Sequence, residues 1–424
     1  MLLRFSASNF GSLRDRQELS LVASKLKGES KGLIEAPELR NESILPAAVI
    51  YGANASGKSN FVKALAHMRD FVRNSHRQGE PGAPLSLKPF ALDPEYSHKP
   101  SSFAADFICD GAVYSYGFEA TLAGFIAESL HASRGGRSSL LFERGPEGYI
   151  FGRNLKGRNR LIEEITRPNS LFLSAAAQNN HDELSRVANF FERLHVFSAG
   201  NVSLSFASSP LASRGVRPRT IDLMREIDVG VTDFKIEEAG RDAVAPQLGT
   251  SPPDSRFNTA TTIVGNLADR QMNLELRLGH PAKDGRNVYF DLADESDGTV
   301  QLLGVLDSVF WGLEHGQVVI IDEFGSRLHT RASEIILSLF NNKETNPKGA
   351  QLIVATHDTN LLNAEGLRRD QVWFTEKDQA GATHLYPLTD YFIRKGDNLE
   401  KGYLQGRFGA IPFAGSAANL LRAV

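Results

Sequence analysis

Eight consecutive residues, 52–59, constrain the fold of this chain more than any other segment. Their sequence, GANASGKS, fits the pattern G-x-x-x-x-G-K-[ST] at every fixed position. The apolar run 44–51 precedes them, and apolar residues recur at helical spacing after Ser59. A buried strand, a glycine turn and a helix, in this order, wrap backbone amides around phosphate groups. The segment therefore predicts a phosphate-binding loop, or P-loop, whose strand belongs to a sheet covered by helices.

The side chains of this loop have expected roles toward ATP. Lys58 would reach the β- and γ-phosphate oxygens, and the hydroxyl of Ser59 would hold Mg²⁺. The residues expected to bind the nucleotide here are Gly52, Asn54, Ser56, Gly57, Lys58, Ser59 and Asn60. The alternative is an ordinary glycine turn beside a surface lysine, which does not account for the strand and helix around it. ATP and Mg²⁺ are the expected ligands.

Three further compact apolar runs, 318–321, 352–355 and 372–374, lie in the last third of the chain. Helical stretches separate them, which is typical of a parallel sheet with crossover helices. Ligands of such sheets bind at the carboxyl ends of the strands. The expected fold class is therefore α/β, with a parallel core sheet around the P-loop.

Two carboxylates directly follow the first of these runs, in the sequence VVIIDE. Asp322 is expected to hold Mg²⁺, through water or Ser59, and Glu323 to polarise the water that attacks ATP. The alternative is a strand that ends in a solvated acidic turn. Because the same chain contains a P-loop, we expect Asp322 and Glu323 to act in catalysis together with Lys58.

A histidine and a glycine turn complete the candidate site. His357, in ATHD after the second run, is expected to contact the γ-phosphate; the alternatives are a capping histidine or a metal pair with Asp358. Ser296 and Gly298, in ESDGT, open a helical stretch whose first amides form an anion site. A plain helix cap is the alternative there. The position of ESDGT shortly before Asp322 favours the anion site.

The patterning divides one composite head, 1–424, into four parts. These are the N-terminal strands and P-loop (1–88), an antiparallel β region (89–180), a helical and variable insertion (181–290) with a flexible loop at 243–259, and the lobe with ESDGT, VVIIDE and ATHD (291–424). Alternation of apolar and polar residues predicts the β region. The loop is rich in Pro, Ser, Asp and Gly.

Composition restricts the class of protein. The formal net charge of -3 gives no overall electrostatic reason to bind nucleic acid. Cys109 is the single cysteine, so a disulfide within the chain and a cysteine-rich zinc site are excluded, in agreement with a reducing compartment. The sequence starts without a signal-peptide pattern, and no run approaches 18 apolar residues. We expect a cytoplasmic protein that does not enter a membrane.

Taken in order, GANASGKS, ESDGT, VVIIDE, SRLH at 326–329 and ATHD resemble the Walker A, signature, Walker B, D-loop and switch-histidine series of ABC-type ATPases. The opening NFGS, the long insertion and the final KGYLQGRFGAIPF resemble the SMC/RecF-like branch. Within that branch the sequence is most similar to prokaryotic defence ATPases related to RloA and abortive-infection proteins and to the OLD family. The resemblance covers nearly the whole chain, but 194–286 matches loosely. No Q-loop glutamine is recognisable, and PFALD at 89–93 is its nearest equivalent.

This resemblance implies a head-to-tail dimer or higher oligomer. Ser296 and Gly298 of one protomer would close on ATP held by the P-loop of the other. The resemblance also implies an AAA-family ATPase that controls a separate effector, such as a nuclease, in antiviral defence. OLD proteins carry a nuclease domain after the ATPase. Since residues 358–424 are too few for such a domain, we expect cleavage to need another chain.

Other functions remain as alternatives. A RecF-like DNA-repair clamp would use a basic cluster to follow phosphates, although a charge run of this size is usually a solvated face. The cluster consists of Arg153, Lys156, Arg158 and Arg160. A P-loop kinase or transferase leaves the signature and the histidine without a role. The N-terminal strands and the long insertion are foreign to ABC transporter subunits, and the lack of sustained heptads excludes the coiled-coil arms of SMC proteins.

Overall fold

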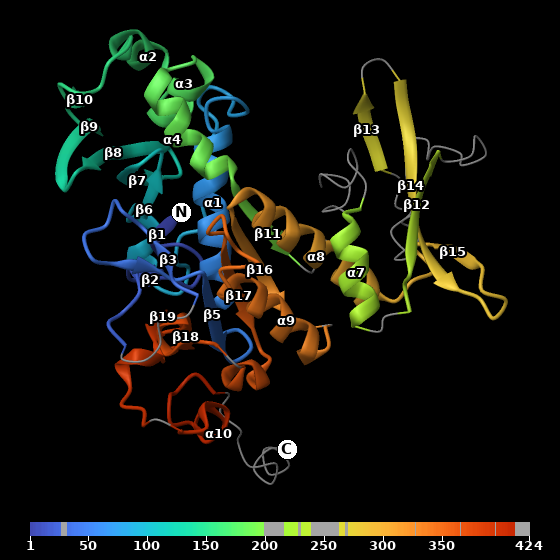
Figure 1. The fold of residues 1–424 in the computed structure, drawn as a ribbon. Helices are drawn as coiled ribbons and strands as arrows, with labels where there is room; N and C mark the ends of the chain where they lie inside the picture. The colour runs from blue at the N-terminus through green and yellow to red at the C-terminus, as the bar shows by residue number, and fades with distance from the viewer. Residues whose placement is uncertain are drawn as a thin grey trace, which may run out of the picture.

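The computed structural model describes most of the chain, in several stretches. These are residues 1–26, 32–198, 216–227, 230–238, 263–267, 270–326, 328–364, 366–394 and 396–411. The flexible loop expected at 243–259 lies outside the described residues. The described elements form two large sheets, a smaller antiparallel sheet and a two-stranded ribbon, with helices packed between them (Figure 1).

A six-stranded sheet forms the centre of the molecule, in the order β11-β16-β17-β5-β18-β19. Its strands are β11 (Leu194–Ser198), β16 (Val318–Phe324), β17 (Gln351–Thr356), β5 (Ala47–Gly52), β18 (Val372–Lys377) and β19 (Thr383–Pro387). All neighbours pair in parallel except β18 and β19, which form an antiparallel hairpin. The predicted parallel sheet is confirmed, and it places the carboxyl ends of β5, β16, β17 and β18 at one edge.

Both faces of this sheet are buried, so successive residues of a strand belong to two cores. In β5, Ile50 packs in the core that contains α1 (Lys58–Asn74) and the antiparallel sheet. Tyr51 packs in the core that contains α8 (Asp297–His315) and α9 (Thr330–Asn341). Full burial of one large apolar side chain contributes about 1.5–3 kcal/mol. The strand that leads into the P-loop is therefore held from both sides.

A seven-stranded antiparallel sheet covers α1, in the order β10-β9-β8-β7-β6-β1-β2. Its strands are β1 (Leu2–Ser8), β2 (Gln17–Ser20), β6 (Ser101–Cys109), β7 (Ala112–Thr121), β8 (Gly124–Arg134), β9 (Arg137–Gly145) and β10 (Gly148–Phe151). The short η1 (Pro94–His98) precedes β6, and α2 (Asn159–Ile165), α3 (Phe172–Gln178) and α4 (Asp182–Glu192) follow β10. The predicted β region at 89–180 thus ends in two helices, α2 and α3.

The insertion at 181–290 is not helical throughout. After α4 and α7 (Pro218–Glu226) it contains four antiparallel strands, in which β14 pairs with each of the others. They are β12 (Asp233–Glu238), β13 (Ile263–Leu267), β14 (Arg270–Pro281) and β15 (Asn287–Asp291), and they lie beside α7 (Figure 1). The physical reason is the period of two in β14, where Leu274, Leu276 and Leu278 alternate with charged residues.

The apolar run 44–51, expected to be one strand, forms two. β4 (Ser43–Ile44) pairs with β3 (Ile34–Glu35), and β5 begins at Ala47, after Pro46. Proline has no amide hydrogen to donate to a strand ladder, so the run is interrupted there.

Short elements follow β17 and β19. They are η3 (Thr359–Asn363), η4 (Arg369–Gln371), η5 (Leu388–Asp390) and α10 (Leu399–Leu404). Within the described stretches, no helix combines the length and the apolar character needed to cross a membrane.

Candidate functional site

The carboxyl ends of four neighbouring strands surround one cavity of about 420 Å³. β5 leads into the P-loop; β16 and β17 lie on one side of it and β18 on the other. The lining residues are Asn54, Ala55, Ser56, Gly57, Lys58, Ser59, Asn60, Asp322, Glu323, His357 and Lys377. Helix α1 begins at this cavity with Gly57 as N-cap and without a capping side chain. The first amides of a helix, together with its dipole, favour an anionic ligand.

Lys58 is buried against the loop that precedes it. Its Nζ donates hydrogen bonds to the carbonyl oxygens of Gly52, at 2.7 Å, and Ala53, at 3.0 Å. Desolvation lowers the pKa of Lys58 to about 8, although the negative charges of Asp322 and Glu323 act in the opposite direction. An anionic ligand in the cavity would offset this desolvation.

Ser59 and Asp322, which are 263 residues apart in the sequence, meet at the cavity. The Ser59 hydroxyl donates to Oδ1 of Asp322 at 3.1 Å, and the backbone amide of Glu323 donates to the same oxygen at 3.1 Å. A hydroxyl and a carboxylate are the hard oxygen ligands that Mg²⁺ accepts beside phosphate oxygens. The two residues therefore fit the predicted Mg²⁺ site.

Strand β16 is irregular where its carboxylates lie. The register of its pairing with β17 shifts between Ile321 and Phe324. Glu323 has a φ of +58°, a left-handed conformation that is uncommon outside glycine and costs about 1–3 kcal/mol. Such a bulge re-aims side chains. Asp322 is buried here, whereas Glu323 is exposed at the cavity.

His357 directly follows β17. Its Nδ1 lies 3.4 Å from Nζ of Lys58. Desolvation, and then the positive charge of Lys58, lower the pKa of His357, so the ring is neutral at neutral pH. Nδ1 then accepts from the ammonium and the proton resides on Nε2.

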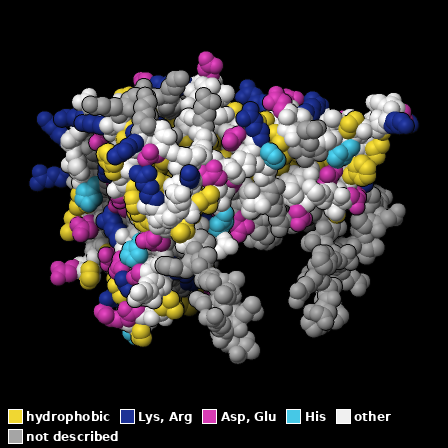
Figure 2. Space-filling model, turned by 90° about the horizontal axis from the view of Figure 1, so that it is seen from below, with side chains coloured by type: hydrophobic (Ala, Val, Ile, Leu, Met, Phe, Trp, Pro, Cys, Tyr) yellow, Lys and Arg dark blue, Asp and Glu magenta, His cyan; other side chains and the backbone are white. Residues whose placement is uncertain are grey.

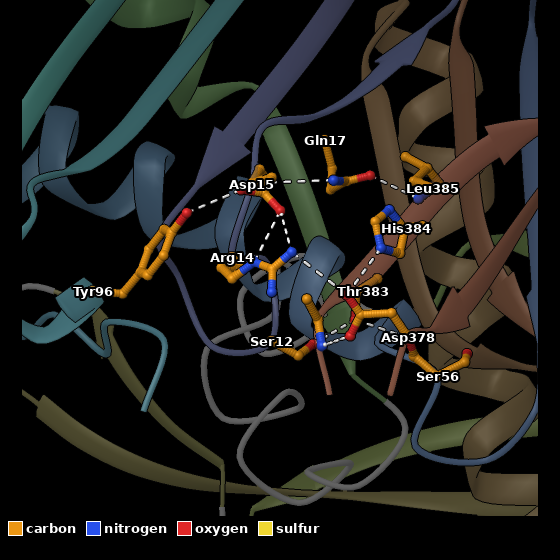
Figure 3. A network of polar contacts seen from close by, with 11 residues as sticks. Ser12, Arg14, Asp15, Gln17, Ser56, Tyr96, Asp378, Thr383, His384 and Leu385 are labelled. Atoms are coloured by element: carbon orange, nitrogen blue, oxygen red, sulfur yellow. Dashed lines mark hydrogen bonds and ion pairs between the residues drawn. The ribbon is translucent and has the colours of Figure 1, made fainter. Parts of the chain in front are cut away.

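Two threonines of the β18–β19 hairpin, Thr375 and Thr383, hold the P-loop. Figure 3 shows Thr383 with Ser12 and Ser56. The hydroxyls of Thr375 and Ser56 are 2.6 Å apart, and Thr383 donates to the carbonyl oxygen of Ser56 at 2.9 Å. The Thr383 hydroxyl also lies 2.7 Å from that of Ser12, which accepts from Nδ2 of Asn60 at 2.7 Å. The P-loop is thus fixed at Ser56 by the hairpin and, in the first turn of α1, at Asn60 by Ser12.

Gly57 must be glycine at this contact. Its φ is +114°, and a Cβ built there would overlap with the side chain of Thr383. The second glycine of the motif therefore serves close packing as well as phosphate approach.

Charged and polar groups attach the turn between β1 and β2 to the same hairpin (Figure 3). Arg14 pairs with Asp15 at 2.9 Å and with Asp378 at 3.5 Å. Oε1 of Gln17 accepts from the amide of Leu385 at 2.7 Å. The N-terminal turn, the P-loop and the hairpin form one connected unit.

Ser296 and Gly298, both in the described part of the chain, do not line this cavity. Ser296 is the N-cap of α8, and its Oγ accepts from the amide of Thr299 at 3.1 Å. The preceding Glu295 has an 8% exposed side chain and contacts Nε2 of His280, on β14, at 2.6 Å. The cap interpretation describes Ser296 within this chain, and contact with another protomer stays a prediction.

Lys377 is the cavity residue that the sequence patterns did not single out. It is the last residue of β18, whose apolar part is the run 372–374. The signal that could have found it was its position at the carboxyl end of a strand next to β5. By contrast, none of the residues 89–93, all described, lines the cavity, and the amide of Phe90 donates to Oδ1 of Asn9 at 2.9 Å.

The basic cluster of the RecF-like alternative, for which a solvated face was the more usual interpretation, is exposed. Arg160, one of its members, forms an ion pair with Glu163 at 2.8 Å. On the face seen in Figure 2, Lys and Arg side chains are interspersed with Asp and Glu. Over the described stretches, no group of three or more His, Cys, Asp or Glu residues could hold a metal ion.

Comparison with known proteins identifies one family. Residues 47–363 match the model of a family described as AAA domain, putative AbiEii toxin, Type IV TA system. The match covers more than half of the chain and includes the P-loop, the start of α8 and the ends of β16 and β17. A search of curated proteins gave no match.

Proposed function

Because the chain belongs to this AAA-domain family of putative AbiEii toxins, a family of P-loop ATPases, we propose that it hydrolyses ATP at the cavity and that hydrolysis controls a partner effector. One observation carries the proposal. Lys58, Ser59, Asp322, Glu323 and His357 converge on a single cavity from three strand ends. These are the groups that hydrolysis of a phosphoanhydride needs.

Each group has a proposed task. Lys58 exchanges the carbonyls of its own loop for the β- and γ-phosphates. Glu323 accepts a proton from the water that attacks the γ-phosphorus, and the bond to the β–γ bridging oxygen breaks to give ADP and phosphate. Neutral His357 donates from Nε2 to the γ-phosphate. Ser59 and Asp322 would hold Mg²⁺, which supplies charge neutralisation on the phosphates when bound.

We propose that the site is completed by a second protomer. Ser296 is exposed at the start of α8 and lies outside the cavity of its own chain. The first amides and the dipole of this 19-residue helix favour an anion. In a head-to-tail dimer or a higher oligomer, Ser296 and Gly298 would contact the γ-phosphate held by the partner's P-loop.

The partner effector is proposed from the family description, which names a putative toxin of a Type IV TA system. An ATPase site that closes between protomers can report nucleotide state to a bound protein. A separate nuclease in prokaryotic antiviral defence, expected from the resemblance to RloA-related and abortive-infection ATPases, fits this arrangement. A RecF-like DNA clamp is less favoured because Glu163 already pairs with one arginine of the basic cluster.

The test is Glu323→Gln. This variant should bind ATP, hydrolyse it about 10²- to 10⁴-fold more slowly and accumulate a dimer, because the general base is lost while the phosphate contacts remain. Turnover and molar mass are measured with and without ATP. Glu344→Gln, which alters an exposed carboxylate after α9, is the matched control. Normal turnover together with an unchanged mass in ATP would contradict the composite site.

A further inference from the structure

Lys377 lies on one face of the β18–β19 hairpin together with the two threonines that hold the P-loop. Thr375 and Lys377 are two residues apart on β18, and Lys377 pairs with Thr383 across the hairpin. Residues two apart, and residues directly paired, point to the same face of a sheet. The two threonines contact Ser56 on this face. Lys377 lies on the same face, two residues beyond Thr375, and lines the cavity.

The side chain of Lys377 is exposed and has no hydrogen bond or ion pair among the described residues. The adjacent carboxylate, Asp378, is already in contact with Arg14 at 3.5 Å and with His384 at 3.4 Å. The ammonium group of Lys377 therefore lies at the cavity without a carboxylate partner among the described residues.

The strand order places Lys377 opposite the catalytic carboxylates. β18 lies on one side of β5, whereas β17 and β16, which carry His357, Asp322 and Glu323, lie on the other. In the proposed reaction the γ-phosphate lies toward His357 and Glu323. A cation on the β18 side then faces the phosphates closer to the nucleoside.

We propose that Lys377 is a second phosphate-binding lysine, which contacts the α- and β-phosphates of the nucleotide while Lys58 serves the β- and γ-phosphates. This inference rests on the proposed function of the cavity. A triphosphate keeps negative charge after Lys58 and Mg²⁺ are bound, and the carboxylates of Asp322 and Glu323 add more. Lys377 offsets this charge at the end of the nucleotide that hydrolysis leaves unchanged.

The test is Lys377→Met in the full-length chain, with affinities for ATP, ADP and pyrophosphate measured by calorimetry. We expect all three affinities to fall by about 3- to 10-fold, because an exposed charged contact is lost. Turnover at saturating ATP should stay within about twofold of wild type, with KM raised, since the contact is the same in substrate and transition state. Lys377→Arg should restore the affinities.

Lys63→Met is the matched control, since Lys63 is exposed on α1 and does not line the cavity. Without nucleotide, Lys377→Met should unfold at the wild-type temperature, which excludes a folding defect. Unchanged affinities would overturn the inference, and so would a loss for ATP and ADP without a loss for pyrophosphate. If Lys58→Ala also bound ATP like wild type, the proposed function itself would fail; a failure confined to Lys377→Met removes only this inference.

Discussion

We propose anion sites at two helix starts, the P-loop and the start of α8, and the chain supports these two segments very differently. Ser56 is bonded to Thr375 and Thr383, and Asn60 to Ser12, all residues distant in sequence. Residues from the first turn of the chain to the last strand of the sheet thus fix one loop. The P-loop is positioned before any ligand arrives, which reduces the entropy that binding costs.

At the start of α8 the capping bond is local. Ser296 caps its own helix through Thr299, and a long-range contact next to it joins Glu295 to His280. His280 belongs to the β12–β15 sheet, apart from the sheet that holds the P-loop. The comparison teaches that the P-loop half of the proposed site is complete within one chain. The α8 half depends on a different part of the molecule and, in our proposal, acts on another protomer.

Of the variants that test this difference between the P-loop and the start of α8, the loss of Lys58 should have the largest effect. Lys58→Ala removes a charged donor to the phosphates, and we expect ATP affinity to fall about 10- to 100-fold. Equilibrium binding of ATP to monomeric protein measures it, with Lys63→Ala as control. If ATP bound as well as to wild type, the P-loop would not be the binding half.

The Ser296→Asp variant distinguishes the role of Ser296 as a helix cap from its proposed contact with the nucleotide of a second protomer. Aspartate caps a helix as well as serine does, so the unfolding temperature should not change. Its charge would face the partner's γ-phosphate, and like charges in an interface cost several kcal/mol, so turnover should fall at least about 30-fold. ATP affinity of the monomer should stay the same. Turnover like that of wild type would show that α8 does not contact nucleotide.

The pH dependence of ATP binding tests the state of Lys58. Its pKa is lowered to about 8, so the cation is present below pH 8 and is lost above it. ATP affinity should therefore fall by up to about tenfold per pH unit above 8, with proton uptake on binding. The stability of the nucleotide-free protein should change with pH in the opposite direction to the ATP affinity. Since the unfolded chain holds this proton more tightly, the free energy of unfolding should rise between pH 8 and 10.5.

Calorimetry in two buffers of different ionisation enthalpy gives the proton uptake at pH 8.5. Lys58→Met should abolish both dependences. A wild-type affinity that is constant from pH 7.5 to 9.5 would contradict the lowered pKa.

Thr383→Val should have the smallest effect. The variant keeps the shape of the side chain but loses the hydrogen bonds to Ser56 and Ser12, each of which contributes about 0.5–1.5 kcal/mol. ATP affinity should fall about fivefold, and Thr383→Ser should recover most of it. Equal affinities of the valine variant and wild type would mean that the hairpin does not position the P-loop.

Local sequence patterns predicted the loop, strand and helix that form the site. They predicted less well the residues that reach the site only through the pairing of distant strands. The P-loop, the strand before Asp322 and the helix after Ser296 follow from short runs of residues whose periodicity is visible. Lys377 could not be found in this way, because one lysine among 47 Lys and Arg residues carries no local signal. It enters the cavity only because β18 pairs with β5, across more than 300 residues of sequence.

The insertion sheet illustrates a different limit. The alternation in β14 was present in the sequence, but its partners β12 and β15 are short, and β12 is largely polar. Pairing, rather than the propensity of each segment, decides such strands. The break at Pro46, by contrast, had a local signal, because proline has no amide hydrogen to donate; the apolar residues on both sides of it favoured a single strand.

The contact between Thr383 and Ser56 also has a consequence for the time course of synthesis. The two residues are 327 positions apart. At about 5–20 residues per second, the ribosome adds Thr383 roughly 16 to 65 s after Ser56. During this interval the P-loop has left the active centre of the ribosome, but the hairpin that fixes it does not yet exist. A growing chain therefore cannot complete its nucleotide site until the β18–β19 hairpin, which contains Thr383, has been translated.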